Sequence, residues 1–214
     1  LHFTIHSFPT RRSSDLRVVA AGLAGTDTWQ GDIAADLAAA LAAERHLARS
    51  HDEVLFYDVD IPDEADQFEY SELDSLLEKG FSALWKAPGD KYLSLNRLVM
   101  VRSEWGAKDF AHIQVADYTR LAIMTEIKAR LRRASIKADG AEIPNVPHIT
   151  TPKAIAALIY SVLEKLEANG LLDDVDTLWA KHKRELAAGE LRVLAPTEMV
   201  DQFHRFLLRQ EVLI

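Results

Sequence analysis

The hydrophobic and polar positions of this chain alternate between helix-like and strand-like spacing. Apolar residues recurring at a period near 3.6 predict helices over residues 33–48, 72–79, 110–135, 152–168 and 175–186. Short β-branched or apolar runs between turn residues predict strands over residues 17–25, 53–59, 81–86, 93–102 and 191–194. This order predicts an α/β (α+β) fold, in which a central β-sheet is flanked by helices.

Local signals mark the ends of several predicted elements. Asp32 is a plausible cap for the first helix, and Ser71 with Asp74 three residues later is close to a capping box. Residues 87–90, Ala-Pro-Gly-Asp, predict the turn of a hairpin. Thr151 followed by proline predicts an N-cap, and Asn169-Gly170 predicts the end of that helix.

The first sixteen residues have an unusual origin. Residues 7–16, SFPTRRSSDL, read back through the genetic code as the end of a widely used short-read sequencing adapter, and residues 1–6 fit the same adapter. We therefore interpret residues 1–16 as a non-native, adapter-derived segment and expect no ordered role for it. On this interpretation the native sequence starts at Arg17, within a longer gene, and the chain is a truncated C-terminal piece.

Composition excludes several functional classes. Removing residues 1–16 deletes Arg11, Arg12 and Asp15 and changes the net charge from −8 to −9. An acidic balance argues against a nucleic-acid partner bound through a broad basic face. No run approaches the roughly 18 apolar residues of a membrane span, so we expect no membrane insertion. The absence of cysteine excludes disulfides, thiolate nucleophiles and zinc–thiolate sites.

Few residues have the spacing of a chemical site. The turn over residues 22–27 follows a strand and precedes a helix, as a phosphate loop does, but lacks the full glycine fingerprint and a Lys-Ser/Thr pair. His51-Asp52 matches the paired His-Asp of metal phosphohydrolases, yet we expect a solvated loop there. Residues 58–60, Asp-Val-Asp, could hold a divalent cation, whereas His112 and His148 stand alone. We predict no catalytic, cofactor-binding or metal residues, no cofactor, and no enzyme.

The tryptophans and one acidic run have simpler interpretations. Trp29, Trp85, Trp105 and Trp179 are spread along the chain, which favours core or interface packing over a ligand site. The acidic run over residues 173–176 predicts a solvated cap at the start of a helix.

Four stretches and a closing segment, taken in order, are similar to one known family. They are Trp29 with the Ala-rich residues 33–47, the acidic-start segment 69–85, the strand and Arg-ended helix over 91–133, the Thr-Pro helix and following strand over 149–196, and the closing residues 200–206. In element order and in these local sequences, residues 17–214 resemble the C-terminal part of the tail sheath proteins of contractile-tailed phages.

The resemblance implies a mechanical function. It implies a core domain over residues 17–198 and an extended C-terminal arm over residues 199–214 that exchanges strands with neighbouring subunits. Head-to-tail contacts would form a homo-oligomeric helical lattice around the tail tube protein, and this sheath would contract to drive injection. It implies a virion location after assembly in the host cytoplasm. The implied subunit-interface residues are Val200, Gln202, Phe203, Phe206, Leu208, Val212 and Ile214.

Two alternatives stay open from the sequence. One is a soluble nucleotide- or phosphate-binding α/β enzyme that uses the turn over residues 22–27. The other is a different structural protein of the tail or baseplate.

Overall fold

The protein consists of two compact units. A computed structural model of the chain describes residues 3–6, 18–23, 25–100, 109–141, 148–187 and 190–201. One unit ends at Ile113 and the other runs from Gln114 to Asp201, so the division falls within helix α3 (Phe110–Leu131). The resemblance implies a core domain over residues 17–198, and hydrophobic periodicity alone does not divide it, because periodicity shows that a helix has a buried face but not which core receives it.

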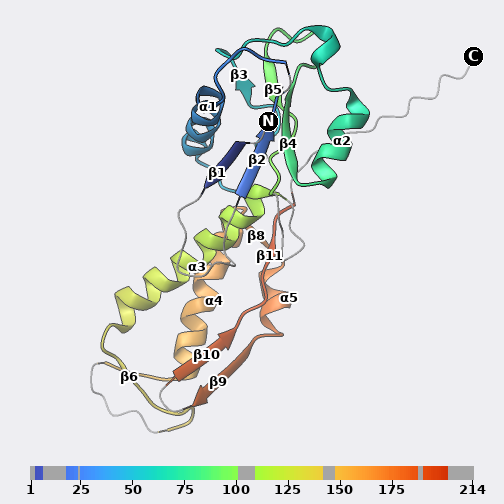
Figure 1. The fold of residues 1–214 in the computed structure, drawn as a ribbon. Helices are drawn as coiled ribbons and strands as arrows, with labels where there is room; N and C mark the ends of the chain where they lie inside the picture. The colour runs from blue at the N-terminus through green and yellow to red at the C-terminus, as the bar shows by residue number, and fades with distance from the viewer. Residues whose placement is uncertain are drawn as a thin grey trace, which may run out of the picture. The chain divides into compact units, whose positions relative to one another are not determined.

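A five-stranded mixed sheet is the centre of the first unit (Figure 1). Its strands, in spatial order, are β1 (Phe3–His6), β2 (Val18–Gly22), β4 (Phe81–Trp85), β5 (Leu93–Leu95) and β3 (Leu55–Phe56). Strand β2 is parallel to β4, whereas β5 is antiparallel to both β4 and β3. Strands β2, β4 and β3 therefore run in the same direction.

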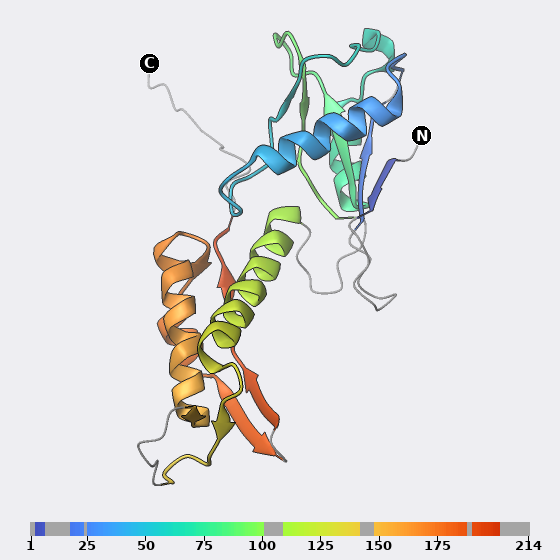
Figure 2. The same cartoon turned by 90° about the vertical axis from the view of Figure 1, so that its left-hand side faces the viewer.

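Two helices cover opposite faces of this sheet (Figures 1 and 2). They are α1 (Gln30–Ala43) and α2 (Tyr70–Glu78). From β2 the chain passes through α1 to β3 at the far edge of the sheet, and from β3 it passes through α2 back to β4. These two connections run in opposite directions across the sheet. When two such connections have the same handedness, their helices lie on opposite faces. The mixed α/β character predicted from the sequence is confirmed.

The core of the first unit lies between α1 and the sheet. Ile33 and Leu37, four residues apart on α1, are buried against Phe56, Leu84 and Leu95 from three strands. Burial of each such side chain contributes about 1.5–3 kcal/mol to stability. The two helix residues and the three strand residues therefore belong to one hydrophobic cluster.

Helix α1 is shorter than predicted at its C-terminal end. Trp29, rather than Asp32, is its N-cap residue, and the helix ends at Ala43 instead of continuing to residue 48. Beyond this end, a Glu44 carboxylate oxygen accepts a hydrogen bond from the His46 amide at 2.9 Å, and Arg49 pairs with Glu44 at 3.4 Å. The His46 hydrogen bond lowers the pKa of Glu44. This local turn replaces the next turn of helix.

The predicted capping box of α2 is shifted by two residues. Glu69 and Glu72 form it, and a Glu72 carboxylate oxygen accepts a hydrogen bond from the Glu69 amide at 2.9 Å. Ser71, the predicted cap, lies inside the helix, where its carbonyl accepts a hydrogen bond from the Ser75 hydroxyl. A glutamate side chain is long enough to reach back to the backbone. The Glu69–Glu72 capping box therefore forms in place of the predicted Ser71–Asp74 one.

The predicted hairpin between β4 and β5 is confirmed, although its second strand ends at Leu95 rather than continuing toward residue 102. Leu84 faces Leu95 in the antiparallel register, and the Asp90 amide donates to the Ala87 carbonyl at 3.0 Å. Gly89 has a φ of +92°, a conformation that favours glycine at this turn. The predicted strand over residues 53–59 is reduced to β3, and at its start Glu53 has a φ of +62°, which is not a strand conformation.

An ion pair that the sequence did not predict stabilises the end of the first unit. Arg97, just after β5, donates two hydrogen bonds of 2.7 Å to the carboxylate of Asp109, which is buried. These hydrogen bonds raise the pKa of Arg97. The Phe110 amide also donates to the Leu98 carbonyl at 3.1 Å. The start of α3 is thus held against the segment after β5.

The second unit packs helices against three small two-stranded sheets (Figure 2). After α3, its helices are α4 (Pro152–Ala168) and α5 (Val175–Trp179). Strands β6 (Ser135–Ile136) and β7 (Ile149–Thr150) are parallel. The antiparallel pairs are β8 (Leu172–Asp173) with β11 (Glu198–Met199), and β9 (Lys183–Ala187) with β10 (Glu190–Leu194).

Helix α4 follows its sequence signals closely. The Thr151 hydroxyl accepts a hydrogen bond from the Ala154 amide at 3.2 Å, and Pro152 occupies the first turn. Asn169 is the C-cap residue, and Gly170 has a φ of +69°. Both predicted ends are therefore confirmed.

Two other helices of the second unit end earlier than predicted. Helix α3 stops at Leu131 because Arg133 has a φ of +62° and Ser135 then pairs with Ile149. Helix α5 stops at Trp179 rather than residue 186, and the following residues form β9 against β10. Pairing with a neighbouring strand overrides the helical propensity of these sequences.

Candidate functional site

The carboxyl edge of the first sheet carries the sequence-predicted turn. Because β2, β4 and β3 run in the same direction, the loops that follow them meet at one edge, where open α/β sheets commonly bind ligands. The turn over residues 22–27 lies there, between β2 and α1, as predicted. Gly25 has a φ of +67°, which explains the glycine at this position.

Acidic residues fill the surroundings of this turn. The Thr26 hydroxyl donates to the Asp60 carbonyl at 3.0 Å, and the Asp60 amide donates to the Thr28 hydroxyl at 2.8 Å. A Cβ atom on Gly25 would lie 2.6 Å from the Cβ of Asp66. Carboxylates this close to the turn repel a phosphate group. We therefore interpret the turn as a structural contact between the loop after β2 and the loop that contains Asp60. This geometry disfavours the phosphate-binding alternative.

The close approach at Gly25 gives a test by substitution. Gly25→Ala should lower the free energy of unfolding by about 2–4 kcal/mol, because the positive φ is strained and the new methyl group meets Asp66. Gly89→Ala is the matched control, since its φ is also positive but nothing lies within 4 Å of the new Cβ. Urea denaturation should show a clearly smaller loss of unfolding free energy for Gly89→Ala. Equal losses would mean that the contact with Asp66 does not contribute to the destabilisation.

The other predicted chemical residues do not assemble into a site. His51 is only 3% exposed and packs on Phe110 with ring centroids 6.1 Å apart, so the expected solvated loop is wrong at this residue. Asp58 and Asp60 are exposed, and His148 is exposed at a φ of +75°. Within the described residues, no group of three or more His, Asp or Glu side chains is arranged to hold a metal ion.

The second unit contains an aromatic cluster that the sequence did not reveal. The Trp179 ring stacks on His182 with centroids 4.3 Å apart and also contacts Tyr160 at 5.5 Å. The Tyr160 hydroxyl donates a hydrogen bond to Asp176. This bond to the carboxylate raises the pKa of Tyr160 to about 12. These residues connect α4 to α5. Tyr160 and Asp176 are 16 residues apart in the sequence, so no local pattern predicts their contact. The predicted solvated cap over residues 173–176 is confirmed, because its three aspartates are exposed and Asp174 is the N-cap residue of α5.

The raised pKa of Tyr160 predicts a pH dependence. Because the folded-state pKa lies above the ordinary value near 10, the hydrogen bond stabilises the fold below pH 10 and is lost as pH rises through about 12. A spectroscopic titration of tyrosinate should show one tyrosine ionising later than the rest. Tyr160→Phe should remove that late phase, and Asp176→Asn should move it to lower pH; a late phase that persists in Tyr160→Phe would refute the assignment.

The tryptophans occupy different environments. Trp29 is 73% exposed, so the expected core packing is wrong there, whereas interface packing stays a prediction. Trp85 is half-buried and meets the Tyr70 ring edge-on at 6.1 Å, and Trp179 belongs to the aromatic cluster. Trp105 lies outside the described residues.

The edge of the first sheet at β2 holds an added strand. Strand β1 pairs antiparallel with β2, with Phe3 opposite Ala21 and His6 opposite Val18. The expectation that residues 1–16 have no ordered role is therefore wrong for residues 3–6. Adding a strand to an edge requires main-chain hydrogen bonds and a β-forming sequence such as Phe-Thr-Ile, not a specific origin of the segment. The β2 edge thus accepts an extended segment.

The predicted interface residues lie mostly outside the described part of the chain. Val200 is half-buried, and its amide donates to the Leu171 carbonyl at 3.4 Å. Met199, the first residue of the predicted arm, pairs with Leu172 in the sheet of β8 and β11. The chain therefore stays in the second unit through Val200. The remaining predicted interface residues are outside the described residues: Gln202, Phe203, Phe206, Leu208, Val212 and Ile214.

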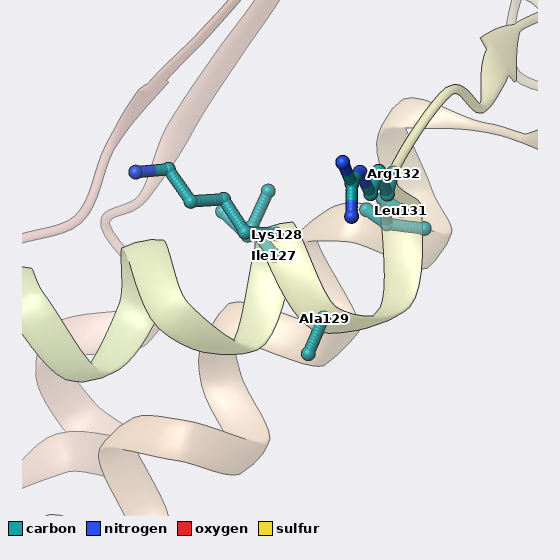
Figure 3. Close-up of a pocket in the computed structure, with 5 residues that line it drawn as sticks. All are labelled: Ile127, Lys128, Ala129, Leu131 and Arg132. Atoms are coloured by element: carbon teal, nitrogen blue, oxygen red, sulfur yellow. The ribbon is translucent and has the colours of Figure 1, made fainter.

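A shallow hollow lies at the C-terminal end of α3 (Figure 3). Ile127, Leu131 and Ala129 supply apolar surface, and Lys128 and Arg132 project from successive turns beside them. The end of a helix favours cations, because the last carbonyl groups carry partial negative charge. The hollow therefore offers an apolar floor with a basic rim.

None of the described helices is both long enough and apolar enough to cross a membrane. Comparison with protein-family models and with curated proteins gives no match for this chain.

Proposed function

We propose that this chain is a structural subunit of a contractile phage tail sheath, which polymerises helically around a tail tube and contracts to drive injection. The observation that supports the proposal best is the β2 edge, where an extended segment adds to the sheet as β1. Such an edge is a template for a strand from another subunit. The order of local sequences from Trp29 to residue 206 supports the same assignment.

In the proposed assembly, the β2 edge is the acceptor and the C-terminal segment of a neighbour is the donor. The segment over residues 202–214 has apolar residues at positions 203, 206–208 and 212–214, and two residues separate it from the end of β11. A donor at one place and an acceptor at another make a head-to-tail contact, and repetition of such a contact generates an open helix where the rotation does not close into a ring. Each of the two units has its own buried residues, so the lattice could contract by rearranging rigid bodies joined by these strands.

Deletion of residues 202–214 tests the proposal. The cut leaves β11 in place, so we expect a folded monomer with an unchanged circular dichroism spectrum but no polymer. The full chain should form open-ended helical polymers in electron micrographs and scatter light in a concentration-dependent way. Polymers of undiminished length without residues 202–214 would refute the proposed donor. Closed rings from the full chain would instead indicate a baseplate or other tail protein.

A further inference from the structure

Acidic charge is concentrated in one stretch of the first unit. Eleven of the 27 residues from Asp52 to Glu78 are Asp or Glu, and none is Lys or Arg. The stretch ends in α2, where Tyr70, Asp74 and Glu78 follow one another at intervals of four residues. Residues spaced in this way lie on one face of a helix. All three are exposed, and Tyr70 retains 53% of its surface. We call them the acidic row.

Basic charge is concentrated at the end of α3 in the second unit. The ten residues from Lys128 to Lys137 include five Lys or Arg and no acid. Lys128 and Arg132 are exposed, four residues apart, and border the apolar hollow of Ile127, Ala129 and Leu131 (Figure 3). We call Lys128 and Arg132 the basic row.

Neither row is neutralised within the described part of the chain. No ion pair there involves Asp74, Glu78, Lys128 or Arg132, although Arg130 beside them pairs with Glu126. Like charges four residues apart repel each other on a helix. Each row is therefore an unfavourable arrangement that an oppositely charged row would relieve.

We propose that the acidic row on α2 of one copy of this chain docks on the basic row and hollow at the end of α3 of a second copy. Both rows repeat their charges at intervals of four residues, so two carboxylates one turn apart face two cations one turn apart. Tyr70, one turn before Asp74, supplies an aromatic ring for the apolar floor. Because the two surfaces are different, the contact is head-to-tail rather than a two-fold symmetric dimer contact. It rests on the proposed function only for the choice of a second copy as the partner.

Charge reversal in the full chain tests this contact. Asp74→Lys with Glu78→Lys, or Lys128→Glu with Arg132→Glu, should each weaken self-association at least about tenfold, because like charges then face each other. Combining all four substitutions should restore association to within about threefold of the original chain, since the charges are again complementary. Sedimentation velocity measures these changes, and rising salt should weaken the original contact.

Matched controls separate this contact from net charge. Asp32→Lys with Asp36→Lys reverses two exposed acids four residues apart on α1, and it should leave association unchanged. Lys128→Gln with Arg132→Gln keeps helical propensity without like-charge repulsion and should weaken association less than the double reversal. Failure of the fourfold variant to regain association, or an equal effect of the α1 control, overturns the proposal. A charge-dependent dimer that never forms helical polymers would support this contact while refuting the sheath function.

Discussion

Leu163→Ala is expected to lower the free energy of unfolding of the second unit by about 2–5 kcal/mol and to leave the first unit folded. Leu163 lies on the buried face of α4 and is only 1% exposed. Truncation removes its buried methyl groups and leaves a cavity, because neighbouring helices and strands relax only partly. The effect should stay local, because each unit has buried hydrophobic residues of its own.

Hydrogen exchange followed along the chain measures this selectivity. Amides of α4 and β8 should lose protection in Leu163→Ala, whereas amides of α1 and β4 should keep theirs. Leu121→Ala is the matched control, because Leu121 is a helical leucine of the same unit with 62% of its surface exposed. It should change stability by less than about 0.5 kcal/mol. Equal loss of protection in both units would mean that the chain unfolds as one cooperative body.

Asp109→Ala is expected to destabilise the first unit by about 2–3 kcal/mol. The substitution leaves the half-buried Arg97 guanidinium without the carboxylate that accepts its two hydrogen bonds. Breaking a fully buried pair has a larger effect, about 3–5 kcal/mol, and partial exposure of Arg97 reduces it. Since the pKa of Arg97 is raised, its charged form contributes below the ordinary arginine pKa. The deficit should therefore persist between about pH 6 and 9.

Urea denaturation of three variants separates the lost pair from lost packing. Asp109→Asn keeps the shape of the side chain but removes its charge, so it should fall between the original chain and Asp109→Ala. Replacing both partners, with Arg97→Met and Asp109→Leu, removes the unpaired charge and should recover most of the stability. If the double variant is as unstable as Asp109→Ala, the ion pair is not the cause of the loss.

Elements with local signals could be predicted from the sequence. Thr151-Pro152 and Asn169-Gly170 delimit α4 because a cap, a proline and a glycine act within one helical turn. The hairpin turn at residues 87–90 is similar, because its backbone conformation depends on Pro88 and Gly89 themselves. Such signals need no knowledge of the rest of the fold.

Features that depend on distant partners could not be predicted in this way. Residues 183–187 have good helix formers, yet they form β9 because β10 supplies a complete antiparallel ladder. Arg97 and Asp109 lie 12 residues apart, and Tyr160 and Asp176 lie 16 apart, so no helical or strand period relates them. These pairs form only once the fold brings the residues together. The sequence alone shows that the residues can interact, but not that they meet.

The candidate site shows the same division. The turn at residues 22–27 could be located from its glycines, but its acidic surroundings come from Asp60 and Asp66, which a later loop brings close. The β2 edge could not be identified as an acceptor, since any short apolar strand has the same pattern whether it lies at an edge or in the middle of a sheet. Of the predicted interface residues, only Val200 lies within the described part of the chain.

The proposed sheath requires the β2 edge to accept a strand from another subunit. This requirement is tested most directly by hydrogen exchange on a chain that lacks residues 1–16, because this deletion removes β1 and leaves the edge open. We expect the β2 amides on that edge to exchange rapidly in the monomer and to become protected when the chain polymerises. Polymers that form while those β2 amides stay unprotected would contradict strand addition at this edge.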